Sequence, residues 1–171
     1  HMLNIINNLK PFFEDCHRRF SVREYARTIN VSPPTASKIL SNLSKENLLH
    51  KQQDRQYLLF WANNSSLFKN LAQIYWKQRF EKIGILKYFN EKLINPTIIL
   101  FGSLAKGENT QDSDVDFAII SSKKQINLNI FEKKLKRKIQ ALSFKDLEHI
   151  KNKELRNNIV NGYKLEGRIK L

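Results

Sequence analysis

The fold class of this chain follows from two neighbouring stretches: residues 97–107, Thr-Ile-Ile-Leu-Phe-Gly-Ser-Leu-Ala-Lys-Gly, and residues 113–120, Ser-Asp-Val-Asp-Phe-Ala-Ile-Ile. Each contains an apolar run of strand length, and the first run ends in a Gly-Ser turn. Side chains of a strand point alternately to its two faces, so Asp114 and Asp116 are predicted to project from the same face. The pattern therefore predicts two strands, with a carboxylate pair where the second one begins.

The polar residues of these stretches indicate nucleoside triphosphate chemistry. Two neighbouring carboxylates repel each other unless a cation lies between them, and their hard oxygen atoms suit Mg²⁺ or Mn²⁺. Gly102 allows close approach to the backbone, and Ser103 offers a hydroxyl and an N–H at an expected helix start. We therefore expect Asp114 and Asp116 to hold a divalent metal beside a phosphate-binding turn.

The spacing of these residues resembles a known signature. Gly102-Ser103, ten intervening residues and Asp114-x-Asp116 closely resemble the motif of the DNA polymerase beta-type nucleotidyltransferase superfamily, and in particular the minimal nucleotidyltransferases of archaea and bacteria. The resemblance implies transfer of a nucleoside monophosphate from a nucleoside triphosphate, with ATP expected, to an acceptor hydroxyl. It implies that Asp114 and Asp116 are the catalytic metal ligands. It assigns nucleotide binding to Gly102, Ser103 and Lys106.

One position departs from the family pattern. Active members usually carry a third carboxylate on the next strand, expected here over residues 138–144, and Gln140 aligns with that position. An amide coordinates a metal weakly and cannot act as a base. Asp146 and Glu148 are the nearest acids, beyond that strand. Three functions stay open: an active transferase, a DNA-binding regulator whose degenerate domain binds nucleotide without catalysis, and an antitoxin-like module that acts on a partner protein.

Residues 3–62 are predicted to form a winged helix-turn-helix domain. Ser21 and Glu24 have the spacing of a capping box at a helix start, and Ser32-Pro33 starts a second helix after a short turn. Strand-like residues 48–51 and 56–61 follow, separated by a polar wing tip. This arrangement resembles the winged helix-turn-helix domains of archaeal and bacterial regulators.

By that resemblance, the helix over residues 32–45 enters the major groove of double-stranded DNA, and the wing contacts phosphate or the minor groove. The residues expected to bind DNA lie on the polar face of this helix and on the wing: Thr35, Ser37, Lys38, Ser41, Asn42, Lys45, Lys51 and Arg55. Winged helices also serve as protein-docking modules, and that alternative stays open.

The rest of the chain predicts a helical connector over residues 63–95 and a nucleotidyltransferase-like domain over residues 96–171. The apolar register of the connector shifts near Gln78 and at Gly84, which predicts either two helices or one kinked helix. A homodimer through its exposed apolar residues stays open. The whole is a two-domain chain of the α+β or α/β class, with a small C-terminal sheet and flanking helices.

Composition narrows the range of partners. The net charge is +14 over 171 residues, yet residues 96–125 carry three Lys or Arg against four Asp or Glu. Basic surface around an acidic site attracts polyanions such as nucleic acid and triphosphates. No apolar run reaches the roughly 20 residues that a membrane span needs. Cys16 is the only cysteine, which excludes an intrachain disulfide, so we expect a cytoplasmic protein without membrane contact.

Overall fold

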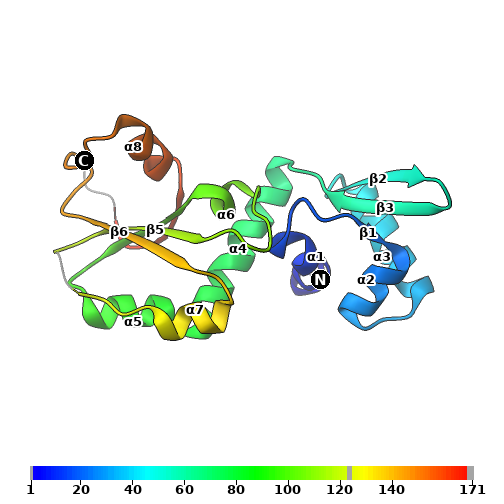
Figure 1. Ribbon diagram of the computed structural model, residues 1–171, viewed down its shortest axis with the longest axis horizontal. Helices are drawn as coiled ribbons and strands as arrows, with labels where there is room; N and C mark the ends of the chain where they lie inside the picture. Colours follow the sequence, from blue (N-terminus) through cyan, green and yellow to red (C-terminus); the bar gives the residue numbers. More distant parts are fainter. Residues whose placement is uncertain (1, 123–124, 169–171) are drawn as a thin grey trace. The chain divides into compact units, whose positions relative to one another are not determined.

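The computed structural model describes residues 2–122 and 125–168 (Figure 1), with side chains from residue 4 onward. The chain divides into two compact units. The first unit extends to Tyr75 and also includes Gly107–Gln111. The second unit comprises Trp76–Lys106 and the chain from Asp112 onward. The expected domain boundaries, after residues 62 and 95, stay a prediction; the last three residues of the expected third domain, 169–171, lie outside the described residues.

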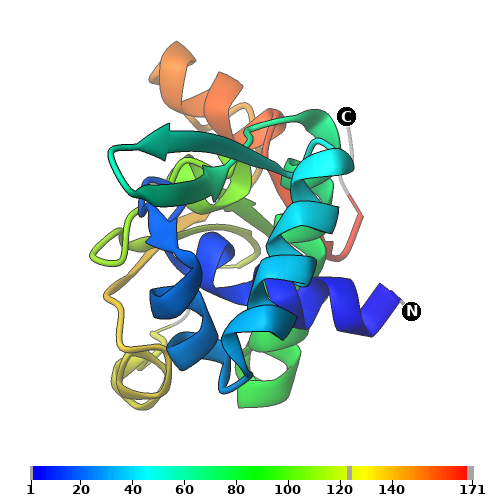
Figure 2. The ribbon, with the colours of Figure 1, turned by 90° about the vertical axis from the view of Figure 1, so that its right-hand side faces the viewer.

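The first unit combines helices with a small antiparallel sheet (Figure 2). The strand order of this sheet is β1-β3-β2. The elements of this unit are α1 (Met2–Glu14), β1 (Phe20–Ser21), α2 (Val22–Ile29), α3 (Pro33–Lys45), β2 (Leu49–Asp54) and β3 (Tyr57–Ala62), followed by the start of α4 (Ser66–Ile83). Tyr25 anchors α2 to α1, because its ring is fully buried and its hydroxyl donates to the Asn8 carbonyl at 2.8 Å. The rings of Phe12 and Phe20 meet edge to face beside it, 5.1 Å apart.

The predicted helix starts are confirmed. Ser21 accepts a hydrogen bond from the Glu24 N–H, and the Glu24 carboxylate accepts one from the Ser21 N–H, which is the reciprocal capping box. Ser32 caps α3, with Pro33 in the first helical position. The first hairpin strand, β2, is longer than predicted, since its pairing continues to Asp54, whereas β3 has the predicted length and lies one residue later. Strand propensity misses this extension because Gln and Asp are poor strand formers whose pairing is set by the partner strand.

A segment far along the chain completes the first unit. Asn109 is fully buried, and its side-chain amide donates to the carbonyls of Phe13 and Glu14 at 2.9 and 3.1 Å. The backbone N–H of Cys16 donates to the Asn109 carbonyl at 2.8 Å, and the Cys16 thiol donates to the side-chain oxygen of Asn109 at 3.4 Å. Residues 107–111 are therefore an integral part of this unit, although they join two elements of the other.

The second unit contains a four-stranded mixed sheet in the order β6-β5-β4-β7. Its strands are β4 (Thr97–Phe101), β5 (Val115–Ile120), β6 (Ile139–Phe144) and β7 (Tyr163–Glu166); its helices, besides the end of α4, are α5 (Ile85–Lys92), α6 (Gly102–Lys106), α7 (Asn129–Leu135) and α8 (Lys153–Val160). β4 pairs antiparallel with β5 and β7, while β5 and β6 run parallel. The connector breaks at Gly84, one of the two predicted positions, which has a φ of +84°.

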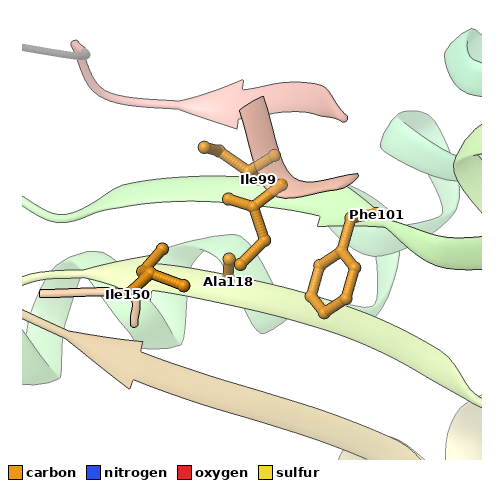
Figure 3. Close-up of a cluster of buried hydrophobic side chains, with 5 residues drawn as sticks. Ile99, Phe101, Ala118 and Ile150 are labelled. Atoms are coloured by element: carbon orange, nitrogen blue, oxygen red, sulfur yellow. The ribbon is translucent and has the colours of Figure 1, made fainter. Parts of the chain in front are cut away.

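Both faces of this sheet are covered. On one face, Ile99, Phe101 and Ala118 pack with Ile150 and Ile159 (Figure 3). On the other face, Phe117 lies against the rings of Phe80 and Phe89, with centroid distances of 5.1 and 5.6 Å. Because β4 and β5 carry apolar residues on both faces, they form the rigid centre from which the polar residues at their ends are presented.

Candidate functional site

The Gly-Ser turn and the Asp-x-Asp pair meet at one end of β4 and β5. Phe101, the last residue of β4, is paired in register with Asp116 of β5. Gly102 follows with a φ of +72°, and a Cβ atom built on it would overlap the Asp116 carboxylate, 3.1 Å from its Cγ. A side chain at position 102 would therefore strain the backbone and displace the Asp116 carboxylate.

The two carboxylates differ in environment. β5 begins at Val115, so Asp114 lies immediately before the strand rather than on it as predicted, and it is exposed. Asp116 is half-buried on the strand. Burial raises the pKa of the Asp116 carboxyl, and the charge of Asp114 raises it further. The ionised form of Asp116 is thus disfavoured, which is the condition that a bound cation relieves.

The strand register places an amide beside this pair. Asp116 is the register partner of Gln140 on the parallel strand β6, and Gln140 is exposed. Residues opposite each other on adjacent strands share a face, so the amide is the side chain next to the carboxylate. Asp114, Asp116 and Gln140 carry hard oxygen donors, the kind that suits Mg²⁺ or Mn²⁺. Within the described residues, no group of three or more His, Cys, Asp or Glu residues could hold a metal.

The two acids that follow β6 lie in the segment before α8. Asp146 accepts hydrogen bonds from the backbone N–H of His149 at 3.0 Å and pairs with its Nδ1 at 2.7 Å. These hydrogen bonds from His149 lower the pKa of the Asp146 carboxyl. The Asp146 carboxylate is thus engaged within its own turn, while Gln140 is the residue aligned with Asp116.

Ser103 and Lys106 belong to the short helix α6. Ser103 directly follows the Gly102 turn and is partly exposed. Lys106 is exposed, and its Nζ lies 3.4 Å from the Asn158 side-chain oxygen in α8. No sequence pattern singled out Asn158, since an asparagine in a polar helix carries no signal of its own.

Arg137 is buried within a run of basic residues. Such a run, here over residues 133–138, is typical of a solvated helix face, yet Arg137 is only 7% exposed. α7 ends at Leu135, and Lys136 adopts a left-handed conformation with a φ of +56°. This turn redirects the chain before β6 and brings Arg137 into the interior. Basic residues of a helix and of its C-terminal turn look alike in the sequence, so the sequence carries no signal of this burial.

The residues predicted to bind DNA lie in the first unit. All of them are exposed except Ser41, which is partly buried. Thr35, Lys38, Asn42 and Lys45 have the three- and four-residue spacing of one helix face on α3. The opposite face buries the apolar residues Ala36, Leu40 and Leu43. Of the other four, Ser37 and Ser41 also lie on α3, whereas Lys51 lies on β2 and Arg55 at the hairpin turn.

Comparison with known families bears on the second unit. Residues 84–165 match the family model described as polymerase beta, nucleotidyltransferase. The matched segment includes both motifs, and the match supports assigning it to the nucleotidyltransferase superfamily, with a generic nucleotidyl-transfer function. Nucleotidyltransferases of this type generally use divalent metals. Searches of curated proteins and of solved structures found no match. Across residues 2–122 and 125–168, every helix is too short or too polar to cross a membrane.

Proposed function

We propose that the second unit is a metal-dependent nucleotidyltransferase, which transfers a nucleoside monophosphate from a nucleoside triphosphate to an acceptor hydroxyl. ATP is the expected donor. The observation that carries this proposal is the close approach of Gly102 to Asp116, because it brings the Gly-Ser turn and the Asp-x-Asp pair next to each other. The family match over residues 84–165 supports it independently.

Each residue has a separate task in this reaction. Asp114 and Asp116 would hold Mg²⁺ or Mn²⁺, which when bound neutralises charge on the triphosphate and on the leaving pyrophosphate. The Ser103 hydroxyl and the Lys106 ammonium would bind phosphate oxygen atoms. The acceptor oxygen forms a bond to the α-phosphorus, the bond from that phosphorus to the bridging oxygen breaks, and pyrophosphate leaves with the electron pair. Because Gln140 cannot take the proton of the acceptor hydroxyl, that proton passes to water.

The test is transfer of label from each α-labelled nucleoside triphosphate, with pyrophosphate release measured in parallel. Mg²⁺ or Mn²⁺ would be present, and a cell extract would supply acceptors. Asp116→Asn should abolish both signals. Asp112→Asn is the matched control, since it removes an exposed carboxylate four residues away and should leave transfer unchanged. Equal transfer by the wild type and Asp116→Asn would contradict the proposal.

A second candidate is a nucleotide-binding regulator without transfer. The pairing of Gln140 with Asp116 favours it, because the amide replaces the base that active members use. This candidate predicts metal-dependent triphosphate binding that is lost in Asp116→Asn, with no release of pyrophosphate. An antitoxin-like module predicts instead that a partner protein copurifies with the chain.

We further propose that the first unit is a winged helix-turn-helix domain that binds double-stranded DNA. The support is the exposed polar and basic face of α3, whose opposite face is buried, together with the hairpin that follows it. Lys38 and Lys45 on α3 and Lys51 and Arg55 on the hairpin would contact phosphates. A nucleotide-dependent change in DNA affinity would connect this activity to the regulator candidate.

A further inference from the structure

Arg137 is a buried arginine that the proposed reaction does not use. It lies in the turn between α7 and β6, where its backbone N–H donates to the Glu132 carbonyl at 3.3 Å. Burying a guanidinium is costly unless its donors are satisfied. Its Nη1 donates a 2.7 Å hydrogen bond to the carbonyl oxygen of Ser113.

The Ser113 carbonyl lies next to a proposed metal ligand of the second unit. Ser113 directly precedes Asp114, which lies outside the strand and lacks the support of a strand ladder at its own position. One residue further on, the Val115 N–H donates to the Lys138 carbonyl at 2.9 Å. The Arg137 side chain and the neighbouring Lys138 carbonyl thus hold the backbone on both sides of Asp114.

A second arginine shares the aromatic partner of the first. The guanidinium carbons of Arg79 and Arg137 each lie 5.3 Å from the ring centroid of Trp76. Arg79 donates from Nη2 to the Leu135 carbonyl at 3.2 Å, whereas Arg137 donates to Ser113. Burial, and then the charge of Arg137, lower the pKa of Arg79. The two guanidinium groups thus lie beside the same Trp76 ring and donate to different carbonyls.

We propose that Arg137 is a positioning residue of the nucleotidyl-transfer site, which sets the place of Asp114 through its hydrogen bond to the Ser113 carbonyl. This inference rests on the proposed function, because it assigns Asp114 to the binding of a divalent cation. Arg137 itself touches neither the metal nor the nucleotide in this account. Its role is to order the backbone from which the exposed ligand projects.

Charge and geometry predict opposite effects when Arg137 is replaced. Removing a buried positive charge from the same unit strengthens the attraction of the carboxylates for a cation, if charge is all that matters. Removing the bond to Ser113 releases the backbone of Asp114 and weakens cation binding, if position matters. The sign of the change in cation affinity therefore separates the two roles.

The experiment measures Mn²⁺ binding and amide hydrogen exchange on the full chain. Arg137→Met keeps the length of the side chain and removes its charge and donors. Arg79→Met is the matched control, since it removes the other cation beside Trp76 and loses the bond to Leu135. Arg137→Lys retains the charge with a single donor group, and serves if Arg137→Met does not fold.

We expect Arg137→Met to weaken Mn²⁺ binding roughly tenfold or more, the usual effect of losing a group that orients a metal ligand. Exchange at residues 113–116 of the metal-free protein should become faster. Arg79→Met should leave Mn²⁺ binding equal or slightly stronger, and Arg137→Lys should fall between the wild type and Arg137→Met.

Different results would overturn the positioning role of Arg137 and the proposed metal site. Unchanged or stronger Mn²⁺ binding by folded Arg137→Met or Arg137→Lys overturns the positioning role while the metal site stands. Equal weakening by Arg79→Met also overturns it, since the cause would then be general loosening around Trp76. A wild-type protein that binds no Mn²⁺ overturns the proposed function, and the positioning role with it.

Discussion

The Asp116 carboxylate lies at the position that a Cβ atom on Gly102 would take. The two residues are brought together by the antiparallel register of β4 and β5, in which Phe101 faces Asp116. The absence of a side chain at Gly102 thus makes room for a proposed metal ligand as well as for a turn. This contact explains why the Gly-Ser turn and the Asp-x-Asp pair form one unit of structure.

Gly102→Ala should therefore damage the site by displacing Asp116. Mn²⁺ affinity, measured by calorimetry, should fall roughly 10- to 100-fold. The positive φ of +72° adds backbone strain of about 1–3 kcal/mol to the folded state. Gly84→Ala is the control, because Gly84 has a φ of +84° and nothing lies within 4 Å of its Cβ position. It should lose stability while Mn²⁺ affinity stays unchanged; equal affinity in Gly102→Ala would contradict the displacement.

Asn109→Ala should destabilise the first unit. It leaves the buried carbonyl of Phe13 and the partly buried carbonyl of Glu14 without the amide donor that they share, which costs about 2–3 kcal/mol of unfolding free energy. The measurement is the urea midpoint of unfolding. Asn161→Ala is the control, since Asn161 also donates to a backbone carbonyl but is exposed, and it should change stability by about 0.5 kcal/mol at most. A similar midpoint for both variants would show that the Asn109 contacts contribute little.

The Glu24 cap should make stability depend on pH. Hydrogen bonds from Ser21 lower the pKa of the Glu24 carboxyl below its usual 4.5. Its stabilising contribution is therefore fully present above that value and is lost as the pH falls through the folded-state pKa. At pH 7, Glu24→Ala should lower the unfolding free energy by about 1 kcal/mol.

The gap between the wild type and Glu24→Ala should narrow as the pH falls through the lowered pKa of Glu24 in the folded protein, since the carboxyl then loses its charge. Thermal unfolding across this range measures the gap. Glu24→Gln is the control, because it keeps an acceptor for the Ser21 N–H without an ionisable group. A gap that stays constant with pH would show that the charge of the cap carries none of the effect.

DNA binding by the first unit should depend steeply on salt. If Lys38, Lys45, Lys51 and Arg55 all contact phosphates, the logarithm of the affinity should fall with the logarithm of salt concentration at a slope of roughly −3 to −4 per monomer. Lys38→Ala should make this slope shallower by about one. Lys87→Ala is the control, since this exposed lysine of α5 pairs with Glu91. A flat salt response of the wild type would refute the DNA interface.

Some features could be predicted because short-range patterns determine them. The capping box of Ser21 and Glu24, the start of α3 at Ser32-Pro33 and the break at Gly84 depend on residues only a few positions apart. The apolar runs of β4 and β5 were recognisable for the same reason, as was the spacing from Gly102 to Asp116. These short-range patterns are therefore sufficient to indicate a nucleotidyltransferase motif.

Other features depend on contacts between distant parts of the chain. The strand β7 was missed because its four residues pair with β4, more than 60 positions earlier. In the sequence, Asn109 has the features of an ordinary loop residue, and only the fold shows that it is buried against the end of α1. Arg137 likewise resembles its solvated neighbours in the sequence, and only the left-handed turn at Lys136 explains its burial.

The amino-acid sequence alone specifies the chemical groups of the second unit, which are two carboxylates, a Gly-Ser turn and basic helices. Their spacing along the chain is enough to predict the local turn or strand that each belongs to. Which of these groups meet depends on the folded chain. Folding places Gln140 beside Asp116 and the Arg137 guanidinium against the carbonyl before Asp114. The physical reason is that strand register and burial are set by the packing of the whole unit, whereas caps and turns are set by their nearest neighbours.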